Sequence, residues 1–316
     1  DYQDVIASTA EGQILYLVNS ADVRSSELKG QSIKDFQSAL DKINADERTT
    51  ITGTEIVAYA SPDGAEDLND KLSGKRSESA NKAWKQVTKG HEAADPEVKS
   101  VGEDWEGFQK LVSESNLEDK DLIIRVLSMY SDPAVRENEI KNMSQVYTAL
   151  KGEVLPELRR ARLIANVEYQ NFTAEELLKI VDDNADVLDE EALLRVASLV
   201  KDDAQKESIY KKAVSKFNSD RAQYNLAVLY MNQGKTAKAR SALAKVKADD
   251  AEVQNAKGVL ALRDGDLEAA ERFFSKAGGE DAKANLGVVQ ILEKAFKDES
   301  LKERAATDVE FAGYEF

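Results

Sequence analysis

Short apolar runs and helically spaced apolar residues alternate along the first 170 positions of the chain. The run from Ile14 to Val18 is apolar, aromatic and β-branched, which is typical of a buried strand. A helix with one apolar face is predicted next, since apolar residues recur at steps of three, four and three at Ile33, Phe36, Leu40 and Ile43. Ser32 precedes this stripe and is expected to cap the first turn of the helix.

A second strand is expected over residues 50–60, TITGTEIVAYA, because Thr, Ile, Val and Tyr favour a pleated sheet. This strand runs into Ser61-Pro62-Asp63-Gly64, a strong turn signal. From about residue 68 the spacing becomes helical, and the inward face of this helix is predicted at Leu68, Leu72, Ala83, Trp84 and Val87.

The segment after this helix is polar and contains Gly90, Pro96 and Gly102, so residues 88–104 are predicted to be a loop or crossover. Residues 105–155 carry apolar stripes at helical spacing and are predicted to be helical.

Residues 158–169, LRRARLIANVEY, alternate like a strand with one wetter face. The first half therefore predicts a β-α-β-α order, then a helical insertion at about 88–155, then a final strand. The predicted class is α+β.

Strand signals stop after Tyr169, where a domain boundary is predicted at about 170, between domains at 1–170 and 171–316. The sequence Thr173-Ala174-Glu175-Glu176 is a capping box that opens a helix.

Two segments of the second half, residues 220–246 and 251–277, match at a constant offset of 31 residues. The matched small or apolar pairs are Ala227 with Gly258, Gly234 with Gly265, Ala239 with Ala270, Leu243 with Phe274, and Val246 with Ala277. Small residues let paired helices approach closely, and a glycine between them provides the turn. This order resembles the tetratricopeptide repeat and implies a short helical solenoid. Degenerate copies are expected at 190–216 and from Asn285, where Lys294 replaces the turn glycine.

Charge and composition exclude several function classes. A net charge of −16 with a pI near 4.8 works against nucleic acid and anionic lipid, which select for basic patches. No apolar stretch approaches the ~18 residues that a membrane span needs. The chain has no cysteine and only one histidine, His91, and it carries no phosphate-binding glycine loop. We therefore expect neither an enzyme nor a cofactor or metal site. Since the chain opens at Asp1 without a leader-like segment, we also expect a processed or trimmed product.

The residues after the second predicted strand keep a recognisable order. The strand Ile56-Val57-Ala58-Tyr59 is followed by Gly64, Asn69, Leu72-Ser73 and Arg76, with Ser77 after the arginine. This order resembles the signature of the OmpA-like (MotB-type) peptidoglycan-binding domain, where alanine follows the arginine. The resemblance covers about residues 12–169, without much of the helical insertion.

The resemblance implies a ligand, the diaminopimelate stem peptide of peptidoglycan, which carries both a carboxylate and an ammonium group. In the family the helix arginine holds the carboxylate and a turn aspartate holds the ammonium. Arg76 matches the arginine, but Ser61 stands at the aspartate position and supplies no charge. Asp63 is a substitute candidate, and Asn69 matches the family asparagine. The alternative is that this stretch is an ordinary Pro-Asp-Gly turn and that Arg76 is a solvated helix residue that caps or pairs locally.

The leading hypothesis is a cell-envelope scaffold of the periplasm, associated with the outer membrane, that resembles Bacteroidetes envelope proteins. Its first domain would contact peptidoglycan, and its repeats would bind other envelope proteins. The alternative is a protein-interaction module whose OmpA-like domain has lost peptidoglycan binding because of Ser61. A third class, a hydrolase within residues 88–155, has no motif to support it.

Overall fold

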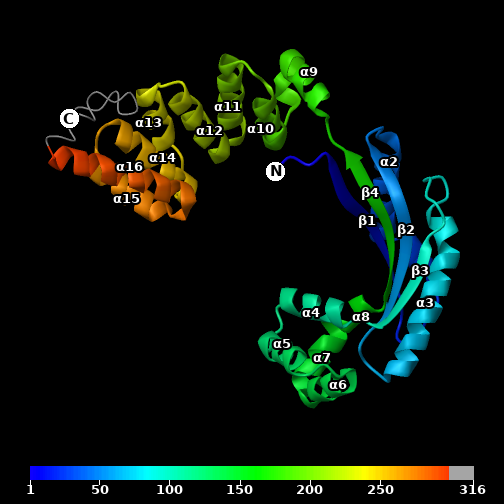
Figure 1. Cartoon of the computed structure of the whole chain (residues 1–316). Helices are drawn as coiled ribbons and strands as arrows, with labels where there is room; N and C mark the ends of the chain where they lie inside the picture. Colours follow the sequence, from blue (N-terminus) through cyan, green and yellow to red (C-terminus); the bar gives the residue numbers. More distant parts are fainter. Residues whose placement is uncertain (299–316) are drawn as a thin grey trace. The chain divides into compact units, whose positions relative to one another are not determined.

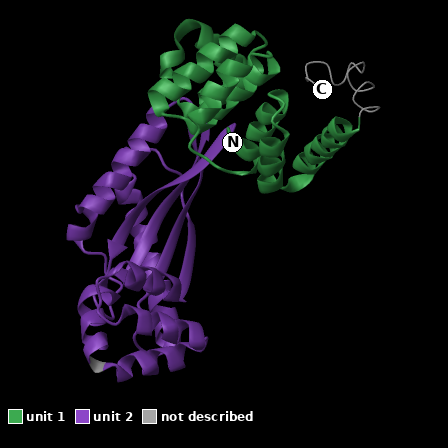
Figure 2. Ribbon diagram, turned by 90° about the vertical axis from the view of Figure 1, so that its left-hand side faces the viewer, with its two compact units in different colours: residues 1–2, 172–316 green, residues 3–171 purple. Residues whose placement is uncertain are grey.

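The chain forms two compact units that divide between Asn171 and Phe172 (Figures 1 and 2). The structure is a computed structural model, and it describes residues 1–298. One unit comprises residues 3–171, and the other comprises residues 1–2 together with the chain from 172 onward. The division lies close to the boundary predicted at about 170, except that the first two residues belong to the second unit.

The first unit is built on one mixed sheet of four strands in the order β1-β4-β2-β3. Its strands are β1 (Val5–Leu15), β2 (Thr49–Ala60), β3 (Glu97–Glu103) and β4 (Arg160–Gln170). Strand β4 pairs antiparallel with both β1 and β2, whereas β2 and β3 run parallel. This sheet, combined with many helices, makes the fold α+β, as predicted.

Two long helices cover one face of the sheet, α2 (Gln31–Ala45) and α3 (Glu66–Val87), and a short helix α1 (Ser25–Leu28) precedes them (Figures 1 and 2). Ile33, Phe36 and Leu40 of α2 are fully buried, which confirms the predicted apolar face. The Phe36 ring packs against Trp84 of α3 with the ring centroids 6.0 Å apart. The core beneath the helices is therefore aliphatic with an aromatic centre.

Some sequence predictions for this unit were wrong. Strand β1 begins at Val5 and ends at Leu15, so Tyr16 to Val18 lie beyond it. Small and polar residues make up much of this edge strand, so it shows no apolar run. One of them, Gly12, leaves room for α2, because an added Cβ there would lie 2.8 Å from the Cβ of Phe36. Ser32 does not cap α2, because its hydroxyl accepts a hydrogen bond from the Gln13 backbone nitrogen instead.

The predicted loop over residues 88–104 contains strand β3, which the sequence analysis missed. Five of the seven β3 residues are exposed, and their charges conceal the strand. The helical insertion consequently begins at Trp105 and not near 88. Its helices are α4 (Trp105–Glu114), α5 (Lys120–Met129), α6 (Pro133–Asn142), α7 (Ser144–Glu153) and α8 (Leu155–Leu158).

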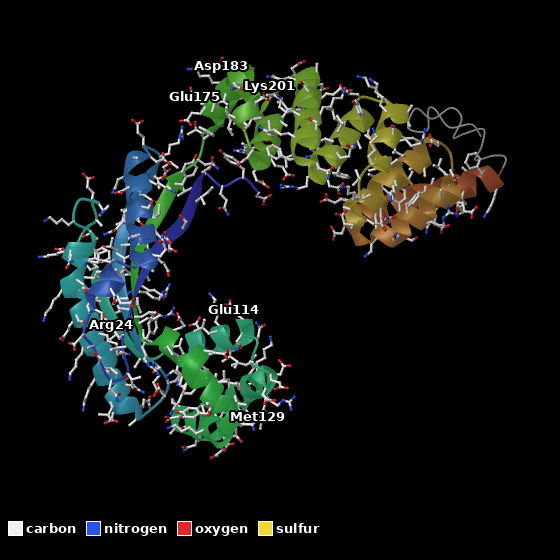
Figure 3. The ribbon with its side chains drawn as sticks, turned by 180° about the vertical axis from the view of Figure 1, so that it is seen from behind. Arg24, Glu114, Met129, Glu175, Asp183 and Lys201 are labelled. Carbon is white, nitrogen blue, oxygen red and sulfur yellow. The ribbon has the colours of Figure 1, made fainter. Side chains whose placement is uncertain are left out.

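The helical insertion has a hydrophobic core of its own, which includes Phe108, Val112, Ile123 and Leu150. Figure 1 places the insertion beside the end of the sheet at which β4 begins. Figure 3 marks Glu114 and Met129 on its surface, and the Met129 side chain is exposed. The insertion is thus a small body of its own within the first unit.

The second unit is all helical among the described residues. Its elements are α9 (Ala174–Asn184), a 3₁₀ turn η1 (Ala185–Val187), α10 (Glu190–Leu199), α11 (Asp203–Phe217), α12 (Asp220–Asn232), α13 (Thr236–Ala244), α14 (Ala251–Arg263), α15 (Leu267–Ala277) and α16 (Gly279–Lys297). The predicted capping box is confirmed, since Thr173 and Glu176 bond reciprocally at the start of α9. Among helices within residues 1–298, none combines the length and apolar character that crossing a membrane requires.

The two clear sequence repeats are helical hairpins, α12 with α13 and α14 with α15. Their turns contain Gly234 and Gly265 at φ of 70° and 77°, a conformation that favours glycine. Gly258 lies against Phe274, whose ring atom Cε1 would be 2.5 Å from an added Cβ. The copy predicted at 190–216 matches the hairpin of α10 and α11. The copy from Asn285 lies on one continuous helix, and any second helix would fall outside the described residues.

Candidate functional site

The four candidate ligand residues lie around the turn between β2 and α3. Ser61 and Asp63 are in the turn, and Asn69 and Arg76 are on α3. Three of them are almost inaccessible, since the relative exposure is 5% for Ser61, 6% for Asn69 and 1% for Arg76. Their hydrogen bonds decide what each can do.

The Arg76 guanidinium is bound by backbone carbonyl groups of the first unit. Its Nε donates to Ser20 at 2.9 Å, its Nη1 to Tyr59 at 3.0 Å and its Nη2 to Leu17 at 3.2 Å. The Tyr16 ring centroid lies 5.2 Å from the guanidinium carbon, within cation–π range. Burial is the main cause that lowers the pKa of Arg76 to about 10, so the group stays charged at neutral pH. Arg76 therefore ties the chain after β1 to the end of β2.

The inward face of α3 is polar over its first turns, contrary to the predicted stripe. Leu68 is 61% exposed and Leu72 is half-buried, while Ser73 and Ser77 are buried beside Asn69 and Arg76. Here the helix covers the ends of strands, where backbone groups need partners. Gly102, for example, donates its backbone N–H to the Ser73 hydroxyl at 3.0 Å. The predicted inward positions Ala83, Trp84 and Val87 are confirmed.

Ser61 and Asp63 are brought together, but they bond to each other. The Ser61 hydroxyl donates to the Asp63 carboxylate, and Nη2 of Arg159 lies 3.8 Å from the other Asp63 oxygen. The Arg76 donors are directed to backbone carbonyl groups instead of to this pair, although the Asp63 charge acts on the Arg76 guanidinium. The hydroxyl and carboxylate are thus already engaged within the protein.

Asn69 belongs to a second polar group at the end of β3. Its Nδ2 donates to Glu103 at 2.9 Å, and Trp105 Nε1 donates to the other Glu103 oxygen at 2.9 Å. Burial is the main cause that raises the pKa of the Glu103 carboxyl, the two hydrogen bonds oppose the shift, and the Glu137 and Glu66 charges add to it. Asn69 therefore joins α3 to the start of the helical insertion.

The helical insertion contacts the turn directly. The backbone N–H of Gly64 donates to Glu137 Oε1 of α6 at 2.6 Å, and Lys141 Nζ lies 2.5 Å from the same oxygen. Pro62 of the turn lines a cavity of about 10 Å³ with Trp105, Phe108 and other insertion residues. Sequence reasoning missed Glu137, Lys141, Arg159 and Glu103. Only Arg159, in the arginine-rich start of the last predicted strand, carried a local signal.

A larger cavity of about 490 Å³ lies in the second unit, lined by Asp1 and Tyr2 together with α10, α12, α14 and the turn before α14. Its lining includes Leu194, Arg195, Tyr224, Asn225, Glu252 and Val253. Burial and the nearby Glu252 and Asp250 charges raise the pKa of Tyr224. Arg195 and Glu252 are exposed, and neither forms an ion pair within residues 1–298. This groove offers apolar contact with unpaired charges at its rim.

No protein-family model matches this chain, and no curated protein matches it. Within the part of the chain that the structure describes, no three His, Asp or Glu side chains come together as a metal site would require. The chain is thus defined by its fold as an α+β unit with a helical insertion, joined to a series of helices that contains hairpins.

Proposed function

We propose that this chain is a non-enzymatic scaffold of the cell envelope whose helical hairpins bind a protein partner. Its first unit would keep the frame of an OmpA-like domain without binding peptidoglycan, and its second unit would be a tetratricopeptide-type solenoid. The periplasmic, outer-membrane-associated location rests on the resemblance of residues 12–169 to envelope proteins.

The state of Arg76 carries this proposal. A ligand carboxylate at Arg76 would have to reach a side chain that is 1% exposed and displace carbonyl groups that already accept its hydrogen bonds. The displaced carbonyl groups would then have no hydrogen-bond donor, and leaving a buried polar group unpaired costs its full desolvation free energy. Ser61 is neutral and adds no counter-charge for an ammonium, and its hydroxyl already donates to Asp63.

The groove on α10, α12 and α14 supports the partner-binding half of the proposal. Its half-buried Tyr224 and Leu194 offer apolar surface, and the exposed Arg195 and Glu252 side chains form no ion pair with another residue of 1–298. Aromatic and arginine side chains in such hollows are the usual anchors of protein interfaces.

The first experiment is a pull-down of the purified chain with peptidoglycan sacculi. We expect retention no greater than that of an unrelated acidic protein of similar size. Specific retention of the wild-type chain that a soluble diaminopimelate peptide competes away would overturn the loss of wall binding and favour the peptidoglycan-binding hypothesis.

The second experiment places a photo-crosslinking residue at Tyr224 in cells that make this protein. We expect one discrete protein adduct, which Arg195→Glu in the same chain weakens about tenfold or more through the reversed charge. The matched control carries the crosslinker at Lys201, an exposed position outside the groove (Figure 3). Equal adducts from both positions, or none from Tyr224, would contradict partner binding in the groove.

A further inference from the structure

Strand β1 forms one edge of the sheet, where it pairs with β4 alone. The backbone N–H of Tyr16 donates to the Arg159 carbonyl at 2.7 Å and continues the register of the two strands. Since bonded and non-bonded pairs alternate along an antiparallel ladder, the even-numbered residues of β1 are the ones that bond to β4. The odd-numbered residues, from Val5 to Leu15, therefore direct their backbone N–H and C=O groups to the free edge.

Side chains already cover the last part of this edge. The Ser32 hydroxyl accepts the N–H of Gln13 at 2.9 Å, and a Glu27 carboxylate oxygen accepts the N–H of Leu15 at 3.1 Å. Arg24, whose Nη2 is 2.9 Å from Glu27, also donates to the Leu15 carbonyl at 3.4 Å. Another strand consequently cannot pair with residues 13–15.

The stretch Val5–Glu11 has no such cover. Within residues 1–298, no group bonds to the outward backbone groups of Val5, Ala7, Thr9 or Glu11. The apolar side chains of Val5 and Ile6 are also exposed. Edge strands are usually protected by lysine, proline or a bulge, yet residues 5–10, VIASTA, are uncharged and regular.

The opposite edge of the sheet, β3, carries the protection that β1 lacks. Glu97, Lys99 and Glu103 place charges along it, and its pairing with β2 shifts register between Ala58 and Tyr59. Of the two edges, only β1 offers an uncharged, regular strand for pairing.

We propose that Val5–Glu11 pairs antiparallel with the same stretch of a second copy of the chain, which joins two sheets edge to edge. The outward, odd-numbered residues must face each other, and the covered residues 13–15 must stay outside the pairing. The register that uses the whole open stretch places Val5 opposite Glu11 and Ala7 opposite Thr9, with Ser8 on the twofold axis. Glu11 is the only charged residue of the stretch, so no like charges face each other.

A second copy suits this edge better than a flexible segment of another protein. The edge is held in strand conformation by β4 in both copies, so neither loses the conformational freedom that a flexible segment would lose on binding. The stretch is shorter than the ~20 to 30 residues that each partner gives to a standard interface, and each copy carries a net charge of −16. We therefore expect a weak dimer that added salt strengthens by screening. The inference does not depend on the function proposed above.

The first test is disulfide trapping in the full chain, which has no cysteine of its own. Ser8 is exposed, and at a non-bonded antiparallel position the two Ser8 Cα atoms would lie about 4.5 Å apart, a distance that a disulfide spans. Oxidation of two thiols by copper phenanthroline should link the Ser8→Cys variant at least about tenfold faster than the Ser100→Cys variant. Ser100 is the matched control, an exposed serine on the other edge strand, β3.

The second test is sedimentation equilibrium of the full chain at several salt concentrations. Ala7→Pro should weaken the dimer at least about tenfold, because proline removes an N–H at the free edge that makes no bond to β4. Circular dichroism checks that this variant folds, and Thr9→Lys, which places a charge on the same edge, serves if it does not.

Three results would overturn the proposal. The first is a chain that stays monomeric up to about 1 mM, which would leave the edge to another protein or to none. The second is a rate of linkage in Ser8→Cys no greater than in Ser100→Cys. The third is a dimer that persists unchanged in the folded edge variants, since it would then form through another surface.

Discussion

The Nη1 of Arg76 on α3 donates to the backbone carbonyl of Tyr59 at 3.0 Å, which fixes the helix to the C-terminal end of strand β2. The same guanidinium holds Leu17 and Ser20 from the chain after β1. An arginine at this position suggests a site for an external anion, but Arg76 instead joins two backbone segments of its own unit through three carbonyl groups. Buried charges persist in proteins when such hydrogen bonds satisfy them.

Replacement of Arg76 by Ala should destabilise the first unit by about 3 kcal/mol or more, because three buried or half-buried carbonyl groups lose a charged donor. Urea unfolding measures this loss. Lys75→Ala is the matched control, since Lys75 is the exposed neighbour on the same helix and should change stability by no more than about 0.5 kcal/mol. A loss for Arg76→Ala as small as that of Lys75→Ala would contradict the clamp.

Ser61→Asp should lower stability instead of creating an ammonium site. The new carboxylate would replace the hydroxyl that donates to Asp63, so that two carboxylates would face each other in a site that is 5% exposed. Like charges at this distance raise the pKa of one partner, and we expect a loss of about 1 to 3 kcal/mol at neutral pH that shrinks on acidification. Thermal unfolding at two pH values measures it. Ser61→Ala, which adds no charge, should show no such pH dependence.

The Glu103 carboxyl should make stability depend on pH. Its pKa is raised from an ordinary 4.5 mainly by burial, so the folded state holds this proton more tightly than the unfolded chain does. Its contribution therefore favours folding below the ordinary pKa and is lost as the pH rises through the raised pKa. We expect the free energy of unfolding of the Glu103→Gln variant, measured by urea unfolding at stepped pH, to vary less over that pH window than that of the wild type. Glu106→Gln, an exposed acid on α4, is the control and should follow the wild-type curve.

Gly258→Ala tests the close packing within the α14 and α15 hairpin. The added methyl group would lie 2.5 Å from Cε1 of Phe274, which has no exposed surface, so we expect a loss of about 1 to 3 kcal/mol. Gly287→Ala on α16 is the matched control, because no atom of the described residues beyond its own stretch of helix backbone lies within 4 Å of its added Cβ. That change should be neutral or stabilise by up to about 1 kcal/mol. Similar losses at both sites would argue against the packing role of Gly258.

Local patterns predicted the helices better than the strands. The stripe at Ile33, Phe36 and Leu40, and the glycine turns at Gly234 and Gly265, follow from spacing that a single helix or hairpin imposes on its own residues. Strand β3 was not predicted because this edge strand has neither an apolar run nor strong alternation, and its pairing with β2 exists only in the assembled sheet. Strand β1 was misplaced for the same reason.

By itself, the sequence determined the α+β class, the apolar face of the first long helix and the helical character of the second half, since periodicity and turn residues act over short distances. It also marked Ser61, Asp63, Asn69 and Arg76 as polar groups near one turn. Only the tertiary structure decided which partners those groups have. Arg76 meets the carbonyls of Leu17 and Ser20, and Gly64 meets Glu137, through contacts between segments far apart in the chain that no local pattern encodes.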